Sequence, residues 1–180
     1  MTGLVNRDTH YGWIAIILHW MMAILMIGLI ILGLYMTRLP ISLEKLRLYG
    51  WHKEWGILVL GLVLLRWLWR ASNTLPSFPG DLPYLQQLAA RAMHLAFYGF
   101  MISMPLTGWM MSSAAGLQVS FFGWFLLPNL VAPNPGLEGI LVTSHEYLGY
   151  ALIAAIAAHT SAALWHHFIH KDDILRRMLP

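Results

Sequence analysis

The sequence predicts an all-α integral membrane protein, folded as a four-helix bundle. Of its 180 residues, 58% are hydrophobic and only 11% are charged, whereas roughly a quarter of the residues in a soluble domain are charged. Four apolar stretches each reach the roughly 20 residues that a spanning helix needs, and a helix satisfies its own backbone in lipid. The alternating segments of a membrane β-barrel are not apparent. We expect one domain over residues 1–180, with helices at about 12–36, 50–70, 88–117 and 140–169.

The segments around these helices differ in character. The first apolar stretch is longer than the apolar part of a signal peptide and has no small-residue cleavage site after it, so we expect it to remain. Residues 37–49 form a polar, basic connection, and residues 72–87 are rich in proline, as in an irregular loop. Residues 118–139 are apolar and aromatic, which favours a segment that lies in the membrane interface and caps what is beneath it.

Lys and Arg residues are unevenly distributed between the two ends of the expected bundle. Cytoplasmic loops of membrane proteins carry the excess of these residues. The larger group lies with both termini and comprises Arg7, Arg66, Arg70, Arg91, Lys171, Arg176 and Arg177. The opposite end carries Arg38, Lys45, Arg47 and Lys53. This distribution predicts that both termini are cytoplasmic. We expect the lipid bilayer, and no nucleic acid, as a partner.

Cysteine is absent from the sequence. Disulfides, iron–sulfur clusters held by cysteines and covalent haem attachment are therefore excluded.

Five of the nine histidines fall inside the expected helices, where a polar ring is costly and usually functional. They are His19, His52, His94, His145 and His159. His145 and His159 are fourteen residues apart, so they share one face of a helix at a separation of about 21 Å. His19 matches the depth of His159, and His52 matches the depth of His145.

The residues four positions before and after each histidine match within these pairs. Alanines flank His19 and His159, whereas a leucine and a glycine flank His52 and His145. Small neighbours leave room for a wide flat group beside the helix, although they also ease helix packing in membranes. A flat group between two imidazoles indicates haem, while zinc prefers three or four close protein ligands. We expect two non-covalent haem b groups, an outer one between His52 and His145 and an inner one between His19 and His159.

Other polar residues are candidates for supporting roles. Arg66, and secondarily Arg70, are expected to pair with the haem propionates, although arginines at helix ends also snorkel to the interface. The role of His94 remains open: it is a rival iron ligand for the inner haem, a quinone contact or a polar residue between helices.

Two clusters at the ends of the bundle are candidate substrate regions. Lys45, Arg47 and Lys53 would attract a small anion toward the outer haem, or would form an ordinary solvated loop. Near the inner haem, the segment with Trp165, His166, His167 and Lys171 offers an aromatic slot, a hydrogen-bond donor and a proton source for a quinone, or serves as an interface anchor.

The chain resembles the bacterial cytochrome b561 family, in particular its superoxide-oxidase-like members. The matching segments cover essentially the whole chain and read HW at 19–20, HKEWGIL at 52–58, RWLWR at 66–70, His94, HEYLGY at 145–150 and AAHTSAALWHHFIHKDDILRRMLP at 157–180. The resemblance implies a four-helix protein of the bacterial inner membrane with two b haems. The ligand pattern of that family falls on His19, His52, His145 and His159.

The resemblance also implies a function. Characterised members take an electron from periplasmic superoxide and pass it to ubiquinone, so a superoxide:ubiquinone oxidoreductase is the first expectation. The alternative is an electron-transfer subunit for a separate periplasmic redox protein, which would dock on residues 118–139. A haem-free protein whose histidines bind a metal or a substrate is the third reading.

Overall fold

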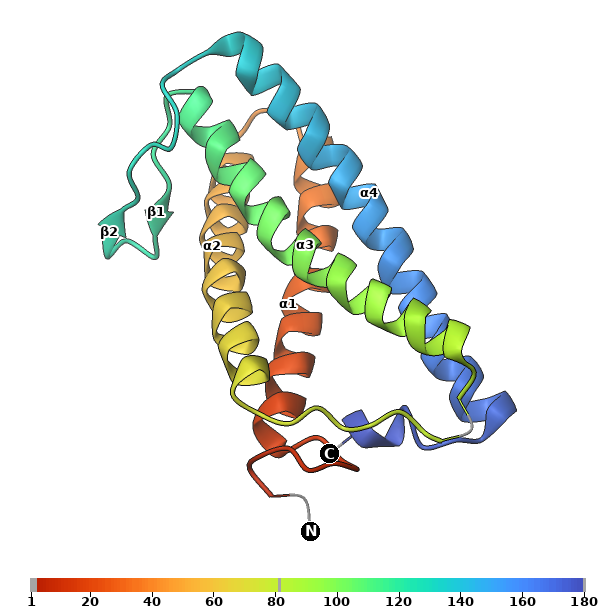
Figure 1. Ribbon diagram of the computed structural model, residues 1–180. Helices are drawn as coiled ribbons and strands as arrows, with labels where there is room; N and C mark the ends of the chain where they lie inside the picture. Colours follow the sequence, from red (N-terminus) through yellow and green to blue (C-terminus); the bar gives the residue numbers. More distant parts are fainter. Residues whose placement is uncertain (1–2, 81, 180) are drawn as a thin grey trace.

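The computed structural model describes residues 3–80 and 82–179 and contains four long helices (Figure 1). These are α1 (Trp13–Arg38), α2 (Leu43–Ala71), α3 (Tyr84–Ala114) and α4 (Pro135–Trp165). Successive helices pack against each other along the chain, whereas the backbone of α4 stays farther from α1 and α2. The pair α3–α4 is inclined relative to the pair α1–α2 (Figure 1). The expected four-helix, all-α architecture is therefore confirmed.

The connection between α1 and α2 is shorter than the sequence suggested. The Ser42 hydroxyl accepts the Lys45 N–H at 3.2 Å, which is an N-cap interaction, and α2 begins at Leu43. The expectation of a polar loop over residues 37–49 is therefore wrong for its second half. Lys45 and Arg47 lie on a helix, where their direction is fixed.

The ends of α3 and α4 also differ from the expected bounds. α3 starts at Tyr84, directly after Pro83, and stops at Ala114, before the positive φ of Gly116. α4 starts at Pro135, where the Asn134 side chain accepts the Leu137 N–H at 3.1 Å.

The chain changes character beyond α4. A five-residue π-helix, η1 (His166–His170), replaces the α-helix that the sequence suggested to residue 169. Lys171 then takes a left-handed conformation with a φ of 57°, and the chain turns back toward the bundle. The short helix η2 (Arg176–Met178) follows.

By length and composition, α1 and the segment Pro135–His170 are apolar enough to cross a membrane. α2 and α3 have 29 and 31 residues, which is long enough to span about 30 Å. Both helices contain polar residues that lower their mean hydropathy. On α2 these include Lys53, Glu54 and Arg66. Composition thus supports two of the four expected spans, and length supports the others.

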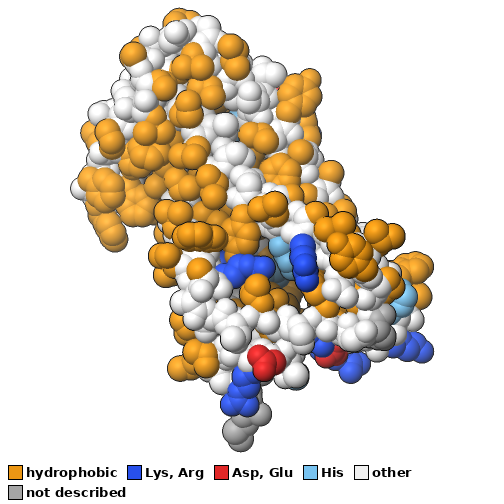
Figure 2. Space-filling view, in the orientation of Figure 1, with side chains coloured by type: hydrophobic (Ala, Val, Ile, Leu, Met, Phe, Trp, Pro, Cys, Tyr) orange, Lys and Arg blue, Asp and Glu red, His pale blue; other side chains and the backbone are white. Residues whose placement is uncertain are grey.

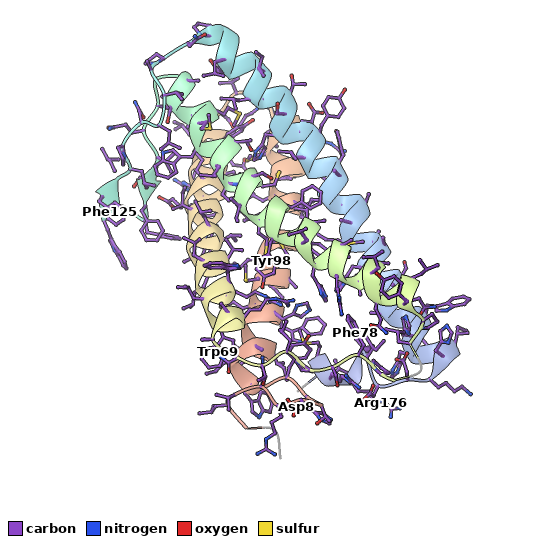
Figure 3. All side chains as sticks on the ribbon, viewed as in Figure 1. Asp8, Trp69, Phe78, Tyr98, Phe125 and Arg176 are labelled. Atoms are coloured by element: carbon purple, nitrogen blue, oxygen red, sulfur yellow. The ribbon has the colours of Figure 1, made fainter. Side chains whose placement is uncertain are left out.

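The core is small and lies in the middle of the bundle. Met22, Val63 and Met101 are almost fully buried, and Phe97 and Tyr98 pack against them. Tyr98 points toward the interior between the helices (Figure 3). Hydrophobic side chains also cover much of the outer surface (Figure 2), as expected for helices that face lipid.

Both ends of the chain lie at the end of the bundle that carries His19 and His159, here called the inner end (Figure 1). The side-chain amide of Asn6 donates to the Thr74 carbonyl at 3.0 Å, and the indole of Trp20 donates to the Met178 carbonyl at 2.6 Å. The first bond joins the N-terminal segment to the second connection, and the second bond joins α1 to the C-terminal tail. The opposite end, with His52 and His145, is called the outer end.

The connection between α3 and α4 forms a hairpin of two short strands, β1 (Ser120–Phe121) and β2 (Phe125–Leu126). It lies beside α2 rather than over the end of the bundle (Figure 1). The expectation that this segment caps the outer end is therefore wrong for the hairpin, which lies at the side of the bundle.

Candidate functional site

Two pairs of imidazoles bridge the space between α4 and the first two helices. His19 of α1 lies opposite His159 of α4, and His52 of α2 lies opposite His145 of α4. Both pairs have ring centroids 6.3 Å apart, although the backbone of α4 does not pack against α1 or α2. Histidine side chains therefore cross this space at two depths.

This spacing fits one metal atom between each pair. With metal–imidazole bonds of about 2 Å, two rings on opposite sides of a metal have centroids about 6.3 Å apart. In the described part of the chain, no three His, Cys, Asp or Glu side chains gather around a common point. A pair therefore supplies two ligands, which suits an iron that already holds four nitrogens of a porphyrin.

A buried apolar layer separates the two pairs. Leu152 lies seven residues from both His145 and His159 on the same face of α4, and it is 4% exposed. Val59 follows His52 by seven residues on α2 and is also 4% exposed. The two sites are therefore separated by buried apolar side chains.

The tautomer of His145 is set by α3. Thr107 donates its hydroxyl proton to the Ser103 or Met104 carbonyl, at 2.8 and 2.9 Å, so its oxygen accepts from His145 Nδ1 at 3.0 Å. A proton on Nδ1 leaves the lone pair on Nε2, which is the arrangement that a metal-binding imidazole needs. Sequence reasoning did not find Thr107.

Glycines of neighbouring helices give room to both outer histidines. A Cβ on Gly33 of α1 would lie 3.3 Å from His52 Cε1, and a Cβ on Gly108 of α3 would lie 3.3 Å from His145 Cε1. Nδ1 of His52 faces α1 beside Gly33, and within residues 3–80 and 82–179 it has no hydrogen-bond partner. The two outer rings are therefore seated in the same way, each against a glycine backbone.

Arg66 lies at the inner pair. Its Nη2 atom is 3.3 Å from His19 Nδ1. A guanidinium only donates, whereas a metal-bound imidazole usually keeps a proton on Nδ1. With iron on His19 Nε2, the guanidinium therefore needs another acceptor, and a carboxylate such as a propionate is suitable. Arg70 lies farther away, over the Tyr98 ring at 6.0 Å.

His94 of α3 is a third imidazole near the inner pair. Its ring centroid is 6.2 Å from that of His159, nearly the same as the distance from His19 to His159. Phe97 meets the His159 ring edge-on at 5.3 Å. The distances alone therefore do not distinguish His94 from His19 as the partner of His159.

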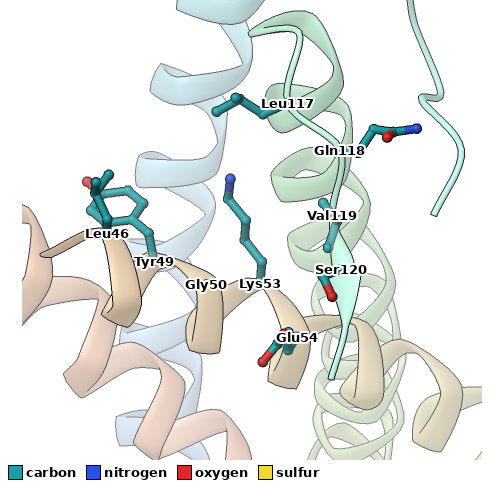
Figure 4. A pocket seen from close by; sticks show the side chains of 9 residues that line it. All are labelled: Leu46, Tyr49, Gly50, Lys53, Glu54, Leu117, Gln118, Val119 and Ser120. Atoms are coloured by element: carbon teal, nitrogen blue, oxygen red, sulfur yellow. The ribbon is translucent and has the colours of Figure 1, made fainter. Parts of the chain in front are cut away.

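The three basic residues of the outer end have different surroundings. Lys45 Nζ donates to the Leu39 carbonyl at 2.7 Å, so it caps the end of α1. Arg47 is exposed. Lys53, next to His52, lines a pocket of about 300 Å³ between α2 and the start of the third connection. Its side chain extends into the pocket, away from that of Glu54 (Figure 4).

At the inner end, the π-helix arranges the candidate quinone residues. His166 Nδ1 donates to Asp172 Oδ2 at 2.5 Å, and both side chains are largely buried. His166 follows His159 by seven residues, so it lies on the same face about 10.5 Å farther along. Trp165 is 57% exposed. His167 Nδ1 is buried without a hydrogen-bond partner among the described residues.

A helical membrane bundle with imidazole pairs at the spacing of a shared iron defines a haem-binding electron-transfer protein. The model of the family described as prokaryotic cytochrome b561 matches residues 10–180. The chain therefore belongs to the prokaryotic cytochrome b561 family, whose members are membrane-bound and bind haem b.

Curated relatives agree with this assignment. The chain is 35% identical to "Cytochrome b561 homolog 2" of Escherichia coli (strain K12), over 97% of this chain and 93% of the relative. It is 36% identical to "Cytochrome b561 homolog 1" of the same organism, over 72% and 73% of the two chains. It is 31% identical to "Probable superoxide oxidase CybB" of Yersinia pestis, also over 72% and 73%.

Proposed function

We propose that this chain is a di-haem b cytochrome of the bacterial inner membrane that oxidises superoxide at its outer end and reduces ubiquinone at its inner end. Both termini are then cytoplasmic, in keeping with the distribution of Lys and Arg. The observation that carries the proposal is the pair of equal 6.3 Å imidazole separations at two depths of α4. The name of the Yersinia pestis relative supports superoxide as the donor.

Each haem, when bound, would supply one-electron transfer rather than oxygen activation, because two histidines would hold its iron. His52 and His145 are the proposed outer ligands, and His19 and His159 are the proposed inner ligands. Thr107 orients His145 through Nδ1. Arg66 neutralises a propionate at the inner end, because its guanidinium needs an anionic acceptor there.

Lys53 is the proposed attraction point for the anionic donor. It lies one residue from His52 and lines the outer pocket, so its charge is next to the outer ligand. Positive potential in a concave site raises the encounter rate with a small anion. Arg47 adds charge from the surface, whereas Lys45 is occupied by the end of α1.

His166 is the proposed proton donor to the quinone at the inner end. Asp172 accepts from its Nδ1, so Nε2 is the atom that exchanges a proton. The exposed indole of Trp165 offers a flat apolar surface for a quinone ring. This arrangement supports His166 over His167, whose Nδ1 has no such partner in the part of the chain that the structure describes.

The test is an optical experiment on the purified chain in detergent. Enzymatically generated superoxide should reduce the haem bands quickly, and added ubiquinone should reverse the change. Intact haem bands that superoxide hardly alters would reject superoxide as the donor and favour the electron-transfer subunit that serves a periplasmic redox protein. An absence of a Soret band after haem reconstitution would reject the haem assignment itself.

A further inference from the structure

The segment between α3 and α4 is a firmly anchored hairpin. Phe121 pairs with Phe125 across the two strands, and their rings stack at 5.3 Å. At the base, the Leu127 N–H donates to the Val119 carbonyl at 2.8 Å, and both side chains are buried. A two-stranded hairpin is marginal by itself in water. This one therefore depends on its aromatic stacking and on contacts with the bundle.

Side chains of α3 form hydrogen bonds with the segment that follows the hairpin. Trp109 Nε1 donates to the Pro128 carbonyl at 3.0 Å. The Leu130 N–H donates to the hydroxyl of Ser113, which is fully buried, at 3.1 Å. The hairpin is thus fixed to the end of α3.

The tip of the hairpin lies alongside α2. The Phe122 ring meets the Trp55 ring edge-on, with centroids 5.3 Å apart, and β1 packs on α2. Phe122 has a φ of 51°, which is uncommon for a bulky residue, and its contact with Trp55 offsets part of that cost. Trp55 is three residues beyond His52 toward the middle of α2, about 4.5 Å along the axis. The tip therefore reaches the depth of the outer histidine pair.

The free face of the hairpin is apolar and aromatic. Trp124 is 80% exposed, Phe125 is 56% exposed and Leu126 is 60% exposed. Phe125 extends away from the helices (Figure 3), within a cluster of hydrophobic surface on that side (Figure 2). Residues 118–137 contain no Asp, Glu, Lys or Arg.

The same apolar surface continues onto α2. Trp51 and Trp55 are 51% and 40% exposed on the lateral face of that helix. The hairpin and α2 therefore present a continuous aromatic band at one depth, and such bands occur where membrane proteins meet the boundary between headgroups and acyl chains.

We propose that the hairpin is embedded in the lipid of the outer leaflet boundary and anchors the outer end of the bundle there. A protein partner is disfavoured because protein interfaces have polar rims, and this face carries no charge. The boundary region suits the hairpin better than the hydrocarbon core, because the outer edges of its two strands leave some backbone groups unpaired. Residues 117–120, which enter the hairpin, also line the Lys53 pocket, so the anchor holds one wall of that pocket.

The absence of cysteine makes the test direct, because single-cysteine variants need no prior removal of thiols. Trp124→Cys and Phe125→Cys in the full chain are each spin-labelled and reconstituted into vesicles of phosphatidylethanolamine and phosphatidylglycerol. Accessibility to oxygen, which concentrates in lipid, is compared with accessibility to a water-soluble nickel chelate. Ile31→Cys, at a 62% exposed position of apolar α1, is the lipid control, and Glu44→Cys, in the exposed first turn of α2, is the water control.

Both hairpin labels should show an oxygen-to-nickel ratio several-fold above that of Glu44→Cys and close to that of Ile31→Cys. Nickel accessibility equal to that of Glu44→Cys would place the hairpin in water and overturn the proposal. Low accessibility to both reagents would place it against protein, and would also overturn the proposal in favour of a second copy or a partner. Phe125→Cys keeps Trp124 in place, so loss of the indole cannot account for a negative result at both positions.

Discussion

Thr107 on α3 accepts a hydrogen bond from Nδ1 of His145 on α4, with the two atoms 3.0 Å apart. Thr107→Val keeps the shape of the side chain and removes this acceptor. The imidazole then donates less electron density to iron, so the midpoint potential of the outer haem should rise by about 20–65 mV, equivalent to about 0.5–1.5 kcal/mol. A spectroscopic redox titration resolves the two haems. Thr107→Ser is the control and should keep the original potential, and an unchanged potential in Thr107→Val would remove Thr107 from this role.

Gly33 and Gly108 are predicted to matter because of the rings beside them. In Gly108→Ala the new methyl group lies 3.3 Å from His145 Cε1, and in Gly33→Ala it lies 3.3 Å from His52 Cε1. Each variant should shift or deplete the outer haem alone, measured by the haem-to-protein ratio and by the low-spin EPR signals. Gly99→Ala on α3 and Gly28→Ala on α1 are matched controls, since a Cβ at either position meets nothing within 4 Å. Equal effects in the controls would indicate general helix disturbance instead.

His19 and His94 compete for one position beside His159. We expect His19→Ala to remove or convert the low-spin inner haem, and His94→Ala to retain both haems. The reason is that His19 belongs to a pair with the same 6.3 Å separation as the outer pair, on a helix whose backbone is not packed against α4. EPR spectroscopy distinguishes the two variants. Loss of the inner low-spin signal in His94→Ala, with retention in His19→Ala, would reverse the ligand assignment.

Variants of Lys53 and Lys45 distinguish the effect of a positive charge in the pocket from that of a positive charge at the end of α1. Lys53→Gln should lower the second-order rate of haem reduction by superoxide roughly 3- to 10-fold and weaken its dependence on salt. Lys45→Gln should change this rate less, because Lys45 Nζ is bound to the Leu39 carbonyl. Stopped-flow measurements at several ionic strengths provide the comparison. The steering role fails if both variants behave alike.

Asp172 and Asp173 are neighbours with different partners. Asp172 accepts from His166, whereas Asp173 accepts from Arg177 Nε at 2.9 Å. Asp172→Asn should slow quinone-dependent reoxidation of the haems about 10- to 100-fold, because His166 loses the carboxylate that orients it for proton transfer. Reduction by the donor should stay unchanged. Asp173→Asn is the control, and a similar slowing there would point to disruption of the tail rather than to proton delivery.

The sequence was informative wherever the signal was local. The apolar stretches indicated four helices, and fourteen residues between His145 and His159 placed both on one face of a helix, because helical periodicity needs only one segment. Contacts between different helices leave no comparable periodic pattern in the sequence. Thr107 and Gly108 are ordinary residues of a spanning helix until α4 brings His145 against them.

The errors of sequence reasoning also have physical causes. Residues 43–49 resembled a polar loop because the outer end of α2 is rich in charge, and the Ser42 cap that starts the helix there is a weak pattern in isolation. The hairpin of residues 120–126 depends on the contact of the Phe122 ring with the ring of Trp55 on α2, and Trp55 lies more than sixty residues earlier in the chain. Asp172 reaches His166 only because Lys171 adopts a left-handed conformation.

The dependence of both histidine pairs on α4 has a consequence for biogenesis. A ribosome makes α1 and α2 first, so His19 and His52 enter the membrane while their partners, His145 and His159, are still to be synthesised. Neither pair is complete until the last helix is inserted and packed against α3. On the proposed ligand assignment, cofactor loading therefore follows translation rather than accompanying it, and a nascent chain arrested before α4 would be an apoprotein at both proposed sites.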